Sequence, residues 1–138
     1  MSKLVKNLRE AIKLAGLKDG DRISFHHHLR NGDYVLNMVM GEIAEMGIKD
    51  LSVNASSLFD CHLPLADHIK NGVVMELLTN YMSSALGGLV SAGLMDKPVQ
   101  FRTHGGRAAD IVNGSTPIDV AFIAAPTADE MGNFTGKL

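Results

Sequence analysis

The sequence predicts an α/β fold with a mostly parallel β-sheet that helices cover on both faces. Three observations predict it: short apolar segments typical of strands alternate with helical segments, most helical segments end at a glycine, and no stretch rich in Pro, Gly and Ser divides the chain. Parallel neighbours need a crossover connection, and right-handed crossovers place helices against the sheet. The length of 138 residues fits one domain, residues 1–138, with a sizeable core.

The first element is an amphipathic helix. Its apolar residues recur at helical spacing with Lys and Arg between them, and Gly16 follows as a C-terminal stop. The apolar residues are Leu4, Leu8, Ala11, Ile12 and Ala15.

Five strands and four further helices follow in alternation. The strand segments are rich in Val, Ile, Leu and Phe, and we expect them at residues 22–27, 51–55, 73–78, 99–103 and 118–124. The remaining helices are expected at residues 33–46, from Pro64 to a stop at 71–72, at 83–92 and at 107–113. Residues 128–136 read as a turn that leads into another element.

The composition excludes several classes of protein. A balance of 13 Lys+Arg against 15 Asp+Glu gives a net charge of −2, which offers no positive field to nucleic acid. Charges interrupt the N-terminal apolar residues, so we expect no signal peptide, and the longest apolar run, 120–125, is too short to cross a membrane. Cys61 has no partner for a disulfide, which favours a reducing compartment. We therefore expect a soluble cytoplasmic protein.

Polar residues follow every predicted strand. They occupy residues 26–33, 56–57, 79–81, 103–107 and 126–129. Ligands of an open α/β sheet bind beyond the carboxyl ends of its strands, so we expect the functional site along this edge.

The histidines and the single cysteine give weak signals for a metal or a nucleophile. Three adjacent histidines cannot all ligate one ion, and strand alternation sends His26 and His28 to one side and His27 to the other. A zinc site could recruit His62, His68, His104 or Cys61, but no spacing matches an established ligand pattern, so we expect no metal. Cys61 could be a thiolate nucleophile, although a lone cysteine near a helix start is more often a small buried residue.

The segment from Thr103 to Arg107 is the sharpest local motif. Two glycines at a strand end permit unusual backbone angles and close approach, and the following helix start offers free N–H groups to an anion. Arg107 could add a two-point contact to a carboxylate or phosphate. The alternative is an ordinary strand-to-helix turn with an exposed arginine. Arg30 with residues 31–33 forms a second candidate anion turn, in which Asp33 also suits a helix N-cap.

Three segments together resemble the citrate lyase alpha subunit family, the citrate CoA-transferase chains. They are ISFHHHLRNGDYVLN at 23–37, RTHGGR at 102–107 and DVAFIAAPTAD at 119–129, and the resemblance runs along nearly the whole chain. It implies the CoA-transferase fold, a three-layer α/β/α arrangement shared with sugar-phosphate isomerases. Members of the family are several times longer and contain two similar domains, and this chain matches the N-terminal one.

The resemblance implies an acyl exchange. The acetyl group on the thiol of an acyl-carrier (gamma) subunit is replaced by citrate, which gives the citryl thioester and free acetate. A citryl lyase (beta) subunit then cleaves that thioester. The resemblance also implies that the chain binds no cofactor covalently. It implies that the chain acts on the dephospho-CoA-type prosthetic group of the carrier and forms a homo-oligomer.

The resemblance also focuses attention on two groups of candidate binding residues. The composition of the Gly-Gly motif suits a carboxylate or oxyanion, and the histidine-rich segment could neutralise the remaining charge of citrate. The candidates are His104, Gly105, Gly106, Arg107, His26, His28 and Arg30. In related CoA-transferases a nucleophilic glutamate belongs to the second half, so no catalytic residue carries over.

Three functions remain open from the sequence. The first is the transferase domain, for which we expect the 138-residue chain alone to be inactive because reacting groups in a two-domain enzyme assemble across both halves. The second is a non-catalytic ligand-binding or assembly module of the same fold. The third, on fold analogy alone, is a sugar-phosphate isomerase.

Overall fold

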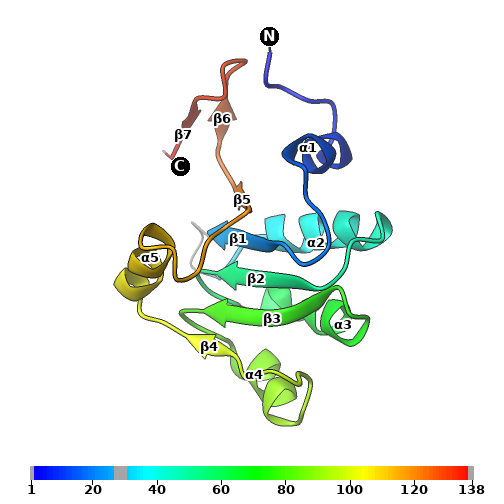
Figure 1. The fold of residues 1–138 in the computed structure, drawn as a ribbon, viewed down its shortest axis with the longest axis vertical. Helices are drawn as coiled ribbons and strands as arrows, with labels where there is room; N and C mark the ends of the chain where they lie inside the picture. Colours follow the sequence, from blue (N-terminus) through cyan, green and yellow to red (C-terminus); the bar gives the residue numbers. More distant parts are fainter. Residues whose placement is uncertain (1, 27–30, 137–138) are drawn as a thin grey trace.

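The computed structural model describes residues 2–26 and 31–136, which form a parallel sheet flanked by helices (Figure 1). The five strands of the main sheet lie in the order β4-β3-β2-β1-β5, and each neighbouring pair is parallel. The strands are β1 (Arg22–His26), β2 (Leu51–Ala55), β3 (Val74–Thr79), β4 (Gln100–Phe101) and β5 (Val120–Ile123). The helices are α1 (Leu8–Ala15), α2 (Val35–Glu45), η1 (Asp60–His62), α3 (Leu65–Lys70), α4 (Ser84–Ser91) and α5 (His104–Val112).

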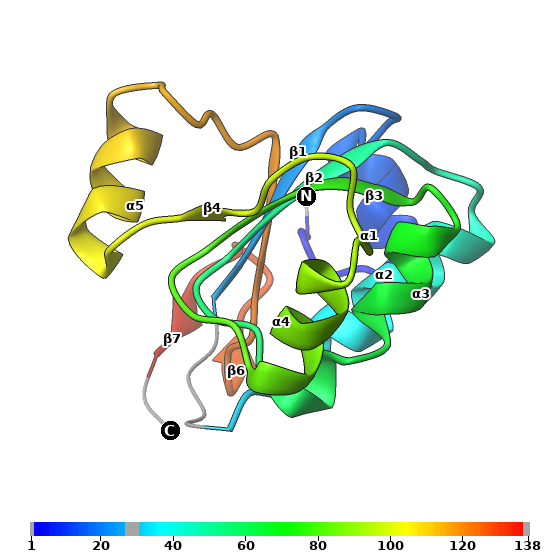
Figure 2. The same ribbon diagram turned by 90° about the horizontal axis from the view of Figure 1, so that it is seen from below.

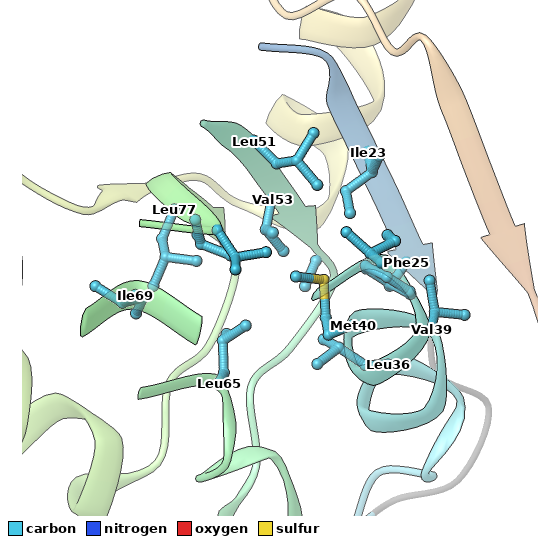
Figure 3. Packing of buried hydrophobic residues seen from close by; sticks show 14 of the residues in the cluster. Ile23, Phe25, Leu36, Val39, Met40, Leu51, Val53, Leu65, Ile69 and Leu77 are labelled. Atoms are coloured by element: carbon cyan, nitrogen blue, oxygen red, sulfur yellow. The ribbon is translucent and has the colours of Figure 1, made fainter. Parts of the chain in front are cut away.

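One face of the sheet holds the apolar core. Ile23 and Phe25 of β1, Val53 of β2 and Leu77 of β3 are each at most 1% exposed. They pack with side chains of α2 and α3, among them Met40 and Leu65, which point toward the strands in Figure 3. Full burial of an apolar side chain of this size contributes about 1.5–3 kcal/mol, so this face supplies most of the stability of the fold.

The opposite face of the sheet carries polar side chains. Ser24 pairs in register with Asn54, and Ser52 with Glu76, so these alternate residues of β1, β2 and β3 share one surface. Figure 2 shows α5 on this side and α1 to α4 on the other. None of the residues of α5 is buried. The fold is therefore the expected α/β arrangement, in which the second helical layer consists here of one helix.

The elements expected from the sequence are present with most bounds shifted by one to three residues, the short helix η1 was not expected, and three regions differ more clearly. The fourth strand, expected at 99–103, is reduced to Gln100–Phe101. The helix expected at 107–113 begins at His104, because the Thr103 hydroxyl accepts a hydrogen bond from the Gly106 N–H at 2.9 Å and caps the helix. The turn at 128–136 is a hairpin of β6 (Thr127–Ala128) and β7 (Phe134–Thr135), which lies near the N-terminal segment in Figure 1.

Within residues 2–26 and 31–136, no helix has the length and apolar character needed to cross a membrane.

Candidate functional site

The loops that follow β1, β2 and β3 enclose a hollow of about 780 Å³, which we call the aromatic hollow. It lies beyond the carboxyl ends of parallel strands, where the sequence predicts the site. It is lined by Asn31, Gly32, Tyr34, Phe59, Asp60, Cys61, Tyr81 and Ser83.

His62 joins two of the loops that form this hollow. Its Nδ1 accepts a hydrogen bond from the Phe59 N–H at 3.0 Å, and its Nε2 donates to the Asp33 carbonyl at 2.8 Å. A backbone N–H can only donate and a carbonyl can only accept, so the proton lies on Nε2 and the imidazole is neutral. The side chain is fully buried. His62 is therefore a structural residue, whereas the sequence offered it only as a possible zinc ligand.

Gly32 brings the same two loops into close contact. Its φ of +83° lies in the left-handed region, and a Cβ there would lie 2.8 Å from Cys61 Sγ and 2.8 Å from His62 Cε1. Asp33 next to it accepts a hydrogen bond from the Val35 N–H at 2.9 Å at the start of α2, but the N-cap position belongs to Tyr34, one residue later than expected.

Cys61 is a partly buried thiol that donates to the Asn31 carbonyl at 3.3 Å. Burial raises the pKa of this thiol, so the nucleophilic thiolate is disfavoured at neutral pH. The geometry supports the packing role and not the nucleophile. No group of three or more His, Cys, Asp or Glu is placed to hold a metal ion among the described residues.

Gly105 and Gly106 lie in the first turn of α5, not in a strained loop. Neither has a positive φ, which corrects the expectation of unusual backbone angles, and the reason is the cap at Thr103. A Cβ at Gly105 would meet nothing within 4 Å. The N–H groups of His104 and Gly105 bond to no described residue, so the positive end of the helix dipole presents two free donors.

Arg107 reaches from α5 to the polar face of the sheet. Its Nε donates to Asn54 Oδ1 at 2.6 Å, and its Nη2 donates to Ser24 Oγ at 2.7 Å and to the Asn54 carbonyl at 3.1 Å. Asn54 is fully buried and Ser24 nearly so. The arginine is thus held across the carboxyl ends of β1 and β2 by uncharged acceptors.

The guanidinium of Arg107 has no compensating charge in the described part of the chain. No described Asp or Glu pairs with it, and burial alone lowers its pKa below the usual range of arginine. Its Nη1 donates to no described residue. A partly buried cation attracts an anion, and because Nε and Nη2 already donate to the sheet, Nη1 is the donor group that remains for one.

The remaining predicted site residues lie along the same edge of the sheet or outside the described residues. His26 is the exposed last residue of β1, opposite Ile123, and His104 is exposed at the start of α5. His28 and Arg30 lie outside the described residues. Ser24 and Asn54 were not predicted as site residues, although polar residues within apolar strands were a signal for them.

Fold and candidate site together define the class: a parallel α/β protein with a candidate ligand site beyond the carboxyl ends of its strands. The family model for citrate lyase, alpha subunit (CitF), matches residues 1–138. Relatives named citrate lyase alpha chain, from Haemophilus influenzae and Klebsiella pneumoniae, are each 49% identical over 98% of this chain, which covers 28% and 27% of their lengths. The chain thus belongs to the citrate lyase alpha subunit family.

A solved structure supports the same relationship. The crystal structure from Streptococcus mutans, described as the alpha subunit of citrate lyase in complex with citrate, superposes with a TM-score of 0.95 at 51% sequence identity. The match covers 99% of this chain and 27% of that one. The chain spans less than a third of the length of these relatives.

Proposed function

We propose that this chain forms the citrate-binding part of a citrate CoA-transferase, which exchanges acetyl for citryl on an acyl-carrier thioester with release of acetate. The observation that carries the proposal is Arg107, a partly buried guanidinium with a free Nη1 and no acidic partner in the described part of the chain. Citrate carries three carboxylates, and a relative with 51% identity is described as a complex with citrate. Arg107 binds one of these carboxylates through Nη1.

The exchange requires groups that stabilise negative charge. A citrate carboxylate attacks the acetyl thioester carbonyl, and the oxyanion that develops there collapses as the carrier thiolate leaves, which gives a mixed anhydride of acetate and citrate. The thiolate then attacks the citryl carbonyl of this anhydride, through a second oxyanion, which releases acetate and forms the citryl thioester. The free N–H groups of His104 and Gly105 at the start of α5 are fixed donors suited to this charge. Exposed His26 lies at the end of β1 and contributes positive charge when protonated.

The implied partners are the citryl lyase subunit, the acyl-carrier subunit with its dephospho-CoA-type group, and a further copy of the chain. These partners are proposed from family membership. The relatives are more than three times longer than this chain, so other parts of such a protein are available to bind them. A cytoplasmic location is proposed on the same basis.

Citrate binding by calorimetry tests the first step. We expect citrate to bind the purified chain, and ribose 5-phosphate, the probe for an isomerase, not to bind. Arg107→Lys should weaken citrate at least tenfold because a lysine cannot keep the fixed contacts to Ser24 and Asn54 while reaching the ligand. Arg102→Lys is the matched control, since Arg102 lies exposed against Asp110 and should leave citrate affinity unchanged.

An exchange assay tests the second step. Acetate release from an acetyl-carrier thioester is measured with the enzyme that contains residues 1–138, and Gly105→Val should slow it about a hundredfold by blocking close approach to the free N–H groups. A Cβ at Gly105 has open space around it, so the variant should keep its melting temperature within a few degrees. Normal exchange in the folded variant would assign this turn a purely structural role.

A further inference from the structure

Two arginines meet the polar face of the sheet, and their surroundings differ in charge. Arg22 at the start of β1 lies 3.6 Å from the Glu76 carboxylate, measured from Nη2 to Oε2. Arg107 instead contacts the side chains of Ser24 and Asn54, neither of which is charged. An arginine that is partly buried normally has an acidic partner, because an unpaired charge away from water is unfavourable. Arg107 lacks such a partner in the described ranges, and this lowers the stability of the fold.

The acidic residues of the polar face and of α5 are engaged by other cations. Glu76 accepts a hydrogen bond from Lys97 at 2.6 Å. Asp110, the acidic residue of α5, accepts one from Arg102 at 2.7 Å. The residues outside the described ranges contain neither Asp nor Glu, so no carboxylate side chain of these 138 residues is left to pair with Arg107.

The buried amide of Asn54 is oriented by the arginine. A guanidinium can only donate hydrogen bonds, so the amide oxygen Oδ1 faces Arg107 Nε, 2.6 Å away, and Nδ2 lies on the other side. The side chain is fully buried, and Nδ2 bonds to no described residue. A buried donor without a partner is unfavourable. Asparagine at position 54 thus lowers stability twice, through its own amide and through the uncompensated charge of Arg107.

An aspartate at position 54 would remove both of these effects. It has nearly the same shape as asparagine, its carboxylate can accept the same bond from Arg107 Nε, and it carries no amide donor. A hydrogen bond between two charged groups is also stronger than one to a neutral amide. Asparagine provides something that aspartate cannot: it holds Arg107 in place without neutralising it, so the full positive charge acts on an anion at Nη1.

We propose that Asn54 is a positioning residue that keeps the positive charge of Arg107 available to a carboxylate ligand. The inference rests on the proposed function, in which that ligand is citrate, and it adds the residue that sets how strongly the site attracts a polyanion. Ser24 has a smaller role, because its hydroxyl fixes Nη2 but a change there leaves the charge intact. Stability and citrate affinity are therefore opposed at position 54.

Asn54→Asp in the enzyme that contains residues 1–138 tests this opposition. We expect the variant to melt at or above the temperature of the parent, yet to bind citrate at least about tenfold more weakly by calorimetry. In the exchange assay the KM for citrate should rise, whereas the KM for the acetyl carrier should stay near the parent value.

The comparison with Ser24→Ala separates charge from contact. This variant loses a hydrogen bond to Arg107 but retains the charge, so it should weaken citrate by no more than about fivefold. A purely structural role of Asn54 predicts the opposite order, because Asn54→Asp loses no contact to Arg107.

Asn7→Asp is the matched control because it makes the same substitution at an exposed site. Asn7 caps α1, which lies on the side of the sheet opposite α5 in Figure 2, and an aspartate can still accept the bond from the Glu10 N–H. This variant should leave citrate affinity unchanged.

A second variant keeps the test independent of folding at position 54. If Asn54→Asp does not fold, Ser24→Asp places a carboxylate beside Arg107 from the neighbouring strand and should weaken citrate to a similar extent. Unchanged citrate affinity in the variant that folds would overturn this inference alone. A parent enzyme that binds no citrate would overturn the proposed function as well.

Discussion

On one face of the sheet Ile23, Phe25 and Val53 are buried against α2 and α3, whereas the other face, on the side of α5 in Figure 2, carries Ser24, Asn54 and Glu76. The two sets alternate along the same strands. The apolar set removes surface from water and stabilises the fold, while the polar set positions an arginine at the carboxyl edge. Alternation thus places the apolar core and the candidate ligand site on opposite faces of the same strands.

The largest expected effect lies on the apolar face. Phe25 is 1% exposed and stacks on Phe122, with centroids 5.4 Å apart, so Phe25→Ala should lower the free energy of unfolding by about 3–5 kcal/mol. Ile123→Ala is the control, because Ile123 is 49% exposed on the other face of β5 and should cost about 1 kcal/mol or less. Chemical denaturation measures both. Equal losses in the free energy of unfolding would mean that the two faces of the sheet contribute equally to stability, which would contradict the prediction.

A smaller effect is expected where α5 meets the polar face. Arg107→Leu leaves the buried Asn54 side chain without its described hydrogen-bond partner, so stability should fall by about 1–3 kcal/mol. Arg102→Leu removes an exposed ion pair with Asp110 and should change stability by less than about 1 kcal/mol. Chemical denaturation gives the free energy of unfolding of both variants, and their difference shows whether Arg107 stabilises the packing of α5 on the sheet. A loss at Arg102 that matched the loss at Arg107 would contradict this.

The smallest expected effect is a dependence of stability on pH that arises from Glu76 on the polar face. Hydrogen bonds from Lys97 and Ser52 lower the pKa of the Glu76 carboxyl below its usual range. A carboxyl whose pKa is lower in the folded state stabilises the fold above its unfolded pKa, and this contribution is lost as the pH falls through the folded pKa.

Glu76→Gln should therefore be less stable than the parent at pH 7, within about 1 kcal/mol, and the difference should vanish in acid. Melting temperatures from neutral pH down to about pH 3 measure this, across the usual range of a glutamate pKa. Glu130→Gln on the exposed hairpin is the control. A difference that stayed constant with pH would exclude the contribution of Glu76.

Much of the fold could be predicted because its signals are local. Residues 51–55 form β2 with the predicted bounds, and the apolar positions of α1 predicted the buried Ile12. The start of α5 was wrong because glycines discouraged a helix there, while the capping bond from Thr103 favoured one. Among the seven candidate site residues, Arg107 donates hydrogen bonds to the sheet. The backbone N–H groups of His104 and Gly105 bond to no described residue.

The sequence by itself determined the α/β class, the alternation of strands and helices, and the edge at which polar residues gather. Tertiary structure alone decided that Arg107 meets Asn54 and Ser24, which lie 53 and 83 residues away in the chain, and that His62 joins two loops beneath the aromatic hollow. The physical reason is one of range. Periodicity and capping act within a few residues, whereas the contacts of a side chain across a sheet depend on how distant strands align.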